Sequence, residues 1–336
     1  MKSTSIIVLL ALIGYSSQVT RHPVRQELVE EIKLKAESWT PVETHQNLLR
    51  DVHPDKIKSR LGNLGFQEGS LISKLMSYLP FKTKFLGNHN HEHNAKSSHK
   101  KLQSPMLQDI FPQSFDFREQ HPTCLREIRD QLDCGACWAF SSSGMLADRI
   151  CKATDGKVNL EFSPQDMVAC SMDNYGCQGG YLMNSIDFLM NDGVVIDKCQ
   201  PYRNALNKCE YSCTDKTIPY KKHYCRPGSL KIMTTAEEFK QELLTNGPFI
   251  VSLTVYEDFI NYGNGTYTYI AGEIIGGHAM KMMGWSTENG KTVWLLQNQW
   301  SDQWGEKGFI KILEGEIGID SIGISCQPEL NSEESK

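Results

Sequence analysis

The residues best suited to chemistry are a cysteine in an unusual setting, followed far downstream by a histidine and an asparagine. Residues 134–138 read Cys-Gly-Ala-Cys-Trp, and residues 138–153 contain no proline, one glycine and apolar side chains at helical spacing. This pattern predicts a helix that begins at Cys137. Because the positive end of a helix dipole stabilises a thiolate, this position favours a nucleophilic cysteine.

The histidine and the asparagine extend this pattern toward nucleophilic catalysis. His278 follows two glycines and lies 141 residues after Cys137, and Asn298 lies 161 residues after it. A nucleophile, a base that takes its proton and a third group that orients the base form the usual constellation. Taken alone, a histidine on a strand is more often a satisfied core residue.

Eleven cysteines can form at most five disulfides, so at least one thiol is left over. Two other interpretations of Cys134 and Cys137 stay open at this point. They are ordinary disulfide partners, or they are the Cys-x-x-Cys pair of a dithiol oxidoreductase. Such redox pairs usually accompany a βαβ pattern, which this sequence lacks.

Composition and charge describe the body that must position these residues. With 336 residues, 40% hydrophobic and 22% charged, the chain has a globular composition, which excludes collagen, coiled coil and wholesale disorder. Residues 1–110 carry 15 Lys and Arg against 10 Asp and Glu, and residues 111–336 carry 20 against 30. A head of charge +5 therefore precedes a body of charge −10. The acidic body excludes a typical nucleic-acid binder.

The N-terminus is typical of a cleaved signal peptide over residues 1–20. Lys2 precedes an apolar run at residues 6–13 that is too short to span a bilayer, and small residues follow. A buried N-terminal helix is the alternative. No later apolar run is long enough for a membrane span. Entry into the secretory pathway would expose the cysteines to an oxidising environment, in which they pair.

The cysteines divide the rest of the chain into two predicted parts. All of them lie between Cys124 and Cys326. Residues 21–107 are expected to form a basic propeptide, and residues 108–336 a mature, disulfide-stapled domain. This layout indicates a precursor that is cut between the two parts.

Within the propeptide, two stretches differ in character. Residues 21–64 are expected to be helical and amphipathic, with a broad apolar face formed by Leu28, Val29, Ile32 and Leu34. A polar basic linker follows at about residues 82–104. Its histidines alternate as metal ligands do, but no cysteine or carboxylate cluster completes a site, so no metal is expected.

Several motifs together make the chain resemble the papain family of cysteine proteases, and within it the cathepsin B group. These motifs are residues 134–138, 276–280 (Gly-Gly-His-Ala-Met), 298–305, 177–181, 111–119 and 38–41. The resemblance covers most of the chain. It implies an α+β, papain-like fold with a helical lobe, a β-barrel-like lobe and an N-terminal helical propeptide. It further implies a cysteine endopeptidase that is made as an inactive precursor and needs no cofactor.

The resemblance also implies roles for single residues. Cys137 is the nucleophile, a thiolate beside protonated His278, and Asn298 fixes the imidazole ring. The side-chain amide of Gln131 and the backbone N–H of Cys137 form the oxyanion hole. The implied substrate-binding residues are Gly179, Gly180, Gly277, Trp300 and Ile322. The first two lack side chains, so an extended substrate can pair with the backbone there.

Four departures from the family pattern bear on function. Gln299 replaces the serine that usually follows the asparagine, and Asp133 adds a negative charge near the site. The long loop whose two histidines block the cleft of cathepsin B is absent between Cys199 and Cys209, which predicts an open cleft and endopeptidase activity. Ile322 stands where cathepsin B has an acidic residue. This predicts a preference for a large apolar side chain two residues before the scissile bond.

The resemblance implies four disulfides and leaves two cysteines without a pattern. The implied pairs are Cys124–Cys151, Cys134–Cys177, Cys170–Cys209 and Cys199–Cys213. A fifth bond between Cys225 and Cys326 is our hypothesis.

Asn264 begins a glycosylation sequon in a turn-rich stretch. Asn289 and Gly290 predict a hairpin turn rather than a phosphate-binding loop.

The expected partners are protein and peptide substrates, the chain's own propeptide as an intramolecular inhibitor, and cystatin-like inhibitors. A monomer is expected, with no nucleic acid. The expected location is the secretory pathway, ending in a lysosome, a lysosome-like vacuole or the extracellular space. Two rival functions remain: a catalytically silent protease homologue that acts as a binding protein, and the dithiol oxidoreductase.

Overall fold

The computed structural model describes residues 21–66 and 111–330. The signal peptide expected at residues 1–20 and the linker expected at 82–104 lie outside the described residues. The α-helices are α1 (Gln26–Lys35), α2 (Pro54–Ser59), α4 (Phe117–Gln120), α5 (Cys137–Ala153), α6 (Pro164–Cys170), α7 (Leu182–Asn191) and α8 (Ala236–Asn246). Short 3₁₀ helices occupy Thr44–Gln46, Leu64–Phe66, Pro122–Cys124, Gly176–Gln178, Glu257–Asn261 and Glu316–Gly318.

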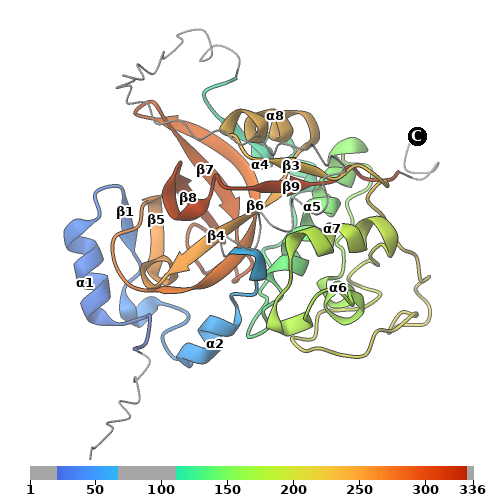
Figure 1. The fold of residues 1–336 in the computed structure, drawn as a ribbon, viewed down its shortest axis with the longest axis horizontal. Coiled ribbons are helices and arrows are strands. Elements are labelled where there is room, and N and C mark those ends of the chain that lie inside the picture. Colours follow the sequence, from blue (N-terminus) through green and yellow to red (C-terminus); the bar gives the residue numbers. More distant parts are fainter. Residues whose placement is uncertain (1–20, 67–110, 331–336) are drawn as a thin grey trace, which may run out of the picture.

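One sheet organises the second half of the described chain. Its strands are β1 (Trp39–Pro41), β2 (Phe115–Asp116), β3 (Lys231–Met233), β4 (Phe249–Tyr256), β5 (Tyr262–Tyr267), β6 (Ile274–Glu288), β7 (Lys291–Gln297), β8 (Phe309–Leu313) and β9 (Gly323–Ser325). The order is β1-β5-β8-β7-β6-β4-β9-β3, and β2 also pairs with β6. The pair β5–β8 is parallel, and the other pairs are antiparallel. Figure 1 shows this sheet beside the helical region of α5, α6 and α7.

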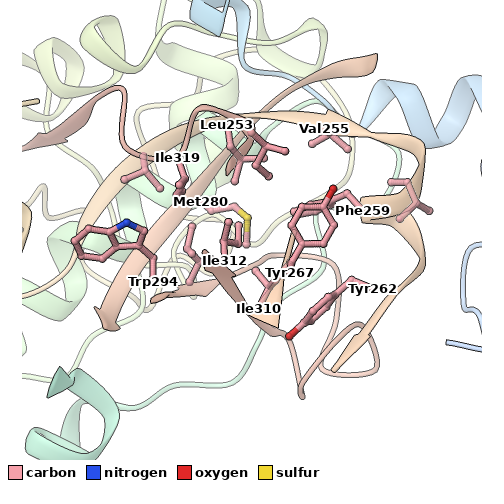
Figure 2. Close-up of a cluster of buried hydrophobic side chains, with 14 of the residues drawn as sticks. Leu253, Val255, Phe259, Tyr262, Tyr267, Met280, Trp294, Ile310, Ile312 and Ile319 are labelled. Carbon is pink, nitrogen blue, oxygen red and sulfur yellow. The ribbon is translucent and has the colours of Figure 1, made fainter. Parts of the chain in front are cut away.

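Two hydrophobic clusters give the molecule its two lobes. Aromatic and branched side chains from β4 to β8 fill the first cluster (Figure 2). The second surrounds α5, which contacts α6, α7 and β6. Almost every residue of α5 is buried, so the helix that begins at Cys137 serves as the centre of the helical lobe. Its first residue is the one the sequence pattern predicts.

The propeptide packs on the sheet rather than standing apart as a helical bundle. Leu28, Ile32 and Trp39 belong to the same buried cluster as the sheet. Strand β1 adds to the edge of the sheet by pairing with β5. The expectation of one helical stretch over residues 21–64 is therefore wrong, since α1 ends at Lys35 and an extended segment follows.

Leu34 corrects the predicted apolar face of α1. Its side chain is 87% exposed, whereas Leu28, Val29 and Ile32 are buried. Leu34 is six residues after Leu28, which places it about 240° around the helix and away from the buried stripe.

The structure has the four disulfides that the resemblance implies. It also has the hypothesised fifth bond, between Cys225 and Cys326. Within the described chain, Cys137 is the free cysteine. Cys134 is bonded to Cys177, so it is not available as the redox partner of Cys137. The dithiol interpretation thereby loses its second thiol.

Two local predictions concern turns. Asn289 and Gly290 join β6 to β7 with positive φ angles of 50° and 76°, as a tight hairpin turn requires. Asn264 does not lie in a turn-rich stretch. It is an exposed residue of β5, directly opposite Thr40 of the propeptide strand β1.

No helix among the described residues is long and apolar enough to cross a membrane.

Candidate active site

Cys137 is the first residue of α5 and is fully buried. Backbone groups of Ala279 and Gly62 lie within hydrogen-bonding range of its thiol. The first of these residues follows His278 on β6, and the second belongs to the propeptide. The helical lobe, the β lobe and the propeptide thus meet at one sulfur atom.

His278 lies in the middle of β6 with its ring fully buried. Its Nε2 atom is 2.9 Å from Oδ1 of Asn298. The indole of Trp300 covers the ring at a centroid distance of 4.7 Å. The other ring nitrogen, Nδ1, has no hydrogen-bond partner.

The backbone of Gln299 determines which imidazole nitrogen carries the proton. Its N–H donates to Oδ1 of Asn298 at 2.9 Å, so this oxygen faces both groups as an acceptor. The Nε2 atom of His278 must then be the donor, which leaves Nδ1 with a free lone pair. A neutral imidazole in this form is ready to take a proton through Nδ1.

Burial controls the charge of both candidate catalytic groups in this precursor. It raises the pKa of Cys137 to about 11, against backbone hydrogen bonds from Ala279 and Gly62 that lower it. Burial lowers the pKa of His278 to about 4, against the hydrogen bond that the ring donates to Asn298, and the charge of Arg60 lowers it further. At neutral pH the covered site therefore favours a neutral thiol and a neutral imidazole. The expected thiolate–imidazolium pair requires the site to be uncovered.

Gln131, the expected oxyanion-hole donor, is fully buried, and its amide is occupied. Its Nε2 atom donates to the carbonyl of Arg60 at 2.9 Å and to that of Cys134 at 2.8 Å. The guanidinium of Arg60 also pairs with Asp130 at 3.0 Å. A propeptide carbonyl thus takes up a donor that the reaction would need for a substrate oxygen.

The propeptide segment at residues 62–64 crosses the site and bonds to it through its backbone. The N–H of Gly180 donates to Gly62 O at 2.8 Å, and the N–H of Leu64 donates to Gly180 O at 3.1 Å. On the opposite side, the N–H of Asn63 donates to Gly277 O at 3.1 Å. The backbone of the glycines expected to bind substrate is therefore used by the chain itself.

Close approach explains why a glycine stands at position 62. A Cβ atom there would lie 1.9 Å from the carbonyl oxygen of Gly135, which no real contact permits. A Cβ at Gly179 would lie 2.7 Å from Gly62 O, and that residue has a φ of 114°. Backbone therefore packs directly on backbone above Cys137.

The remaining residues that the sequence analysis places in the site lie near this propeptide segment or beneath the site. Trp300 is fully buried against His278. Ile322 is 4% exposed and belongs to the same hydrophobic cluster as Cys137 and Ala279. Asp133 lies at the rim, 3.6 Å from Nζ of Lys56 in the propeptide.

Sequence reasoning missed the residues that occupy the site. Gly62 and Arg60 belong to no sequence motif, and the residues around them in the sequence give no sign of a functional site. Gln299 was visible only as a departure from a family pattern. Gly62 and Arg60 contact the site across a large sequence separation, which the order of residues does not reveal. No group of three or more His, Cys, Asp or Glu side chains in the described chain is arranged to hold a metal ion.

This geometry agrees with comparisons to known proteins. The model of the papain family cysteine proteases matches residues 111–328. The chain therefore belongs to the papain family of cysteine proteases.

Within this family, several similar relatives are cathepsin B-like. Cathepsin B-like cysteine proteinase 5 of Caenorhabditis elegans is 36% identical over 67% of this chain and 76% of its own length. Cathepsin B-like CP2 of Giardia intestinalis is 36% identical over 62% and 70%. Procathepsin B S9 of Trypanosoma congolense superposes with a TM-score of 0.74, at 29% identity, over 91% of this chain and 99% of that one. The protein is thus a cathepsin B-like cysteine protease in a zymogen form.

Proposed function

We propose that the mature protein is a cysteine endopeptidase in which Cys137 attacks the peptide carbonyl and His278 moves the proton. The observation that supports this most directly is the bond of His278 Nε2 to Asn298, which leaves Nδ1 unpaired in the strand next to the thiol. A catalytically silent homologue would have no need for this tautomer.

The proposed reaction has two halves. The Cys137 sulfur attacks the carbonyl carbon, and the resulting oxyanion is held by the amide of Gln131 and the backbone N–H of Cys137. Protonated His278 gives its proton to the leaving amine, and a thioester remains. Water then attacks the thioester while His278 takes its proton. The tetrahedral intermediate releases the acid and expels the Cys137 thiolate, which restores the thiolate–imidazolium pair.

We also propose that the cleft is open for internal peptide bonds. The segment between Cys199 and Cys213 is closed by their disulfide after a short excursion, and it contains no histidine. The buried position of Ile322 supports an apolar preference two residues before the scissile bond. A peptide library that varies this position should favour large apolar residues, and a preference for arginine would contradict the proposal.

The proposed maturation and location follow from the same features. Residues 1–20 are proposed as a signal peptide, 21–107 as the propeptide and 108–336 as the mature domain, which acts as a monomer. The five disulfides support passage through an oxidising compartment and delivery to a lysosome, a related vacuole or the extracellular space. Cystatin-like proteins are proposed to inhibit the mature enzyme by entering the cleft that the propeptide leaves.

The decisive experiment is acidification of the purified precursor, followed by hydrolysis of a fluorogenic dipeptide. The expected result is hydrolysis that a thiol-directed epoxide abolishes and that Cys137→Ser lacks. Folded protein without inhibitor-sensitive hydrolysis would favour the silent homologue. Reduction of insulin disulfides in place of hydrolysis would favour the oxidoreductase.

A further inference from the structure

We infer that Gln299 is a positioning residue for His278, and that its side-chain amide sets the pH range over which the Cys137–His278 pair is charged. This inference rests on the proposed function. It concerns a residue that departs from the family pattern at this position.

The side chain of Gln299 lies against the imidazole and is held there. It is 6% exposed, and its Nε2 atom donates to Ala279 O at 2.8 Å. The same nitrogen is 3.4 Å from Nε2 of His278. The amide is therefore fixed to the residue next to the base while it faces the base itself.

The backbone of Gln299 connects two further parts of the site. Its N–H donates to Asn298 Oδ1 at 2.9 Å, and its carbonyl accepts from the N–H of Gln131 at 2.9 Å. The same residue thus contacts the group that orients the imidazole and the segment that carries the proposed oxyanion donor. A rotation of this residue would disturb both.

Ala279 extends this connection to the helix that carries the nucleophile. Its carbonyl oxygen also accepts from Ser141 Oγ at 3.0 Å, and Ser141 is four residues after Cys137 on α5. The length of the glutamine side chain is necessary for this arrangement. A serine at position 299 is two atoms shorter and would leave Ala279 O with a single side-chain donor.

The charge distribution of the amide gives Gln299 an effect on protonation. An NH₂ group donates and cannot accept, so its positive end faces the imidazole ring. This arrangement disfavours the imidazolium, whereas a carboxylate at the same place would favour it.

The test uses the acid-matured protein and three variants. Gln299→Glu reverses the electrostatic effect, and Gln299→Met keeps the length without a donor. Gln303→Glu is the matched control, because it adds the same charge to an exposed position of the same loop. Two measurements are made across the pH range: the rate of Cys137 alkylation by iodoacetamide, and kcat/KM for a fluorogenic dipeptide.

We expect Gln299→Glu to move the alkaline limb of both profiles upward by about 1 pH unit or more. Gln299→Met should lower kcat by about 3- to 10-fold, as expected for one lost hydrogen bond, with KM nearly unchanged. Gln303→Glu should leave both profiles in place. If Gln299 had a purely structural role, its variants would have lower alkylation rates and lower kcat/KM, but the alkaline limb of both pH profiles would stay in place.

The inference is overturned if the alkylation profile of Gln299→Glu superposes on that of the wild type, or if Gln303→Glu shifts it equally. If Gln299→Glu does not mature, the inference is instead overturned by a kcat and a pH profile of Gln299→Met that equal those of the wild type. Failure of the proposed function looks different: the wild type would be alkylated at Cys137 without hydrolysing peptides. The alkylation profiles of the variants would still decide the role of Gln299.

Discussion

Among single residues, Cys137 and His278 depend most strongly on their surroundings. Both are fully buried beneath the propeptide segment at residues 61–64. Both are held in the uncharged form, because neither charge would be hydrated there. The helix dipole at Cys137 favours a thiolate, yet it does not outweigh burial in this state. Under the proposed function, the precursor would be inactive for two reasons at this scale: the propeptide covers the site, and the proposed nucleophile is uncharged.

We predict that alkylation of Cys137 by iodoacetamide at pH 6 is at least about 100-fold slower in the precursor than in the matured protein. In the precursor, the rate should keep rising with pH toward the pKa of about 11. In the matured protein, hydration should let the ion pair form, and the rate should form a plateau near neutral pH. Mass spectrometry of the labelled protein gives both rates, with Cys137→Ser as the unlabelled control. Equal rates at pH 6 would contradict this account of the charges.

Among the elements, the propeptide segment at residues 61–64 covers the site. It is held by three backbone hydrogen bonds to Gly180 and Gly277, and no propeptide side chain is needed for them. The Cys134–Cys177 disulfide fixes the loop before α5 to the segment that carries Gly180. Close approach of these backbones requires small residues, and the buried side chain of Asn63 adds a hydrogen bond to Ser252 Oγ.

Gly62→Ala should weaken this inhibition without affecting the mature domain. The added methyl group would collide with Gly135 O, and overpacking of this kind costs about 1–3 kcal/mol. We therefore expect about 5- to 100-fold more dipeptide hydrolysis by the uncut precursor at pH 6.5. Gly144→Ala is the control, since its Cβ would meet only Lys281, at 3.6 Å. The close-packing argument fails if Gly62→Ala remains as inactive as the wild type.

At the scale of the whole molecule, two arginines of the propeptide form ion pairs with carboxylates of the domain that follows. Arg25 forms two hydrogen bonds of 2.9 Å to Glu257, and Arg60 pairs with Asp130. Burial alone would raise the pKa of Glu257, but the hydrogen bonds from Arg25 hold it below its usual value. A carboxylate whose pKa is lowered by docking stabilises the docked form above its ordinary pKa. This stabilisation is lost as the pH falls through the lowered value.

Glu257→Gln should therefore release the propeptide more readily at pH 6–7 and flatten the acceleration of maturation below about pH 5. The conversion of precursor to mature chain, followed on gels at several pH values, measures this. Glu237→Gln, an exposed residue of α8, removes the same charge without touching the propeptide. High salt at pH 7 should speed maturation of the wild type and have little effect on Glu257→Gln. Insensitivity of the wild type to salt would contradict the electrostatic account.

The sequence by itself determined the chemistry and its order along the chain. The residues 134–138 predicted a helix that begins at Cys137, and this is confirmed because helix signals are local. The odd number of cysteines predicted a free thiol, which is Cys137. The family and the two-lobed α+β fold followed from motifs that are short and specific.

Only the tertiary structure decided what covers the site and which forms its groups adopt. The extended segment after α1 depends on a sheet edge more than 200 residues away, so periodicity alone misassigned it. The fit of Gly62 on Gly135, the contact of Gln299 with His278 and the uncharged pair are products of close packing. Burial and hydrogen bonding between distant segments set these properties, and residue order does not contain the distances on which they depend.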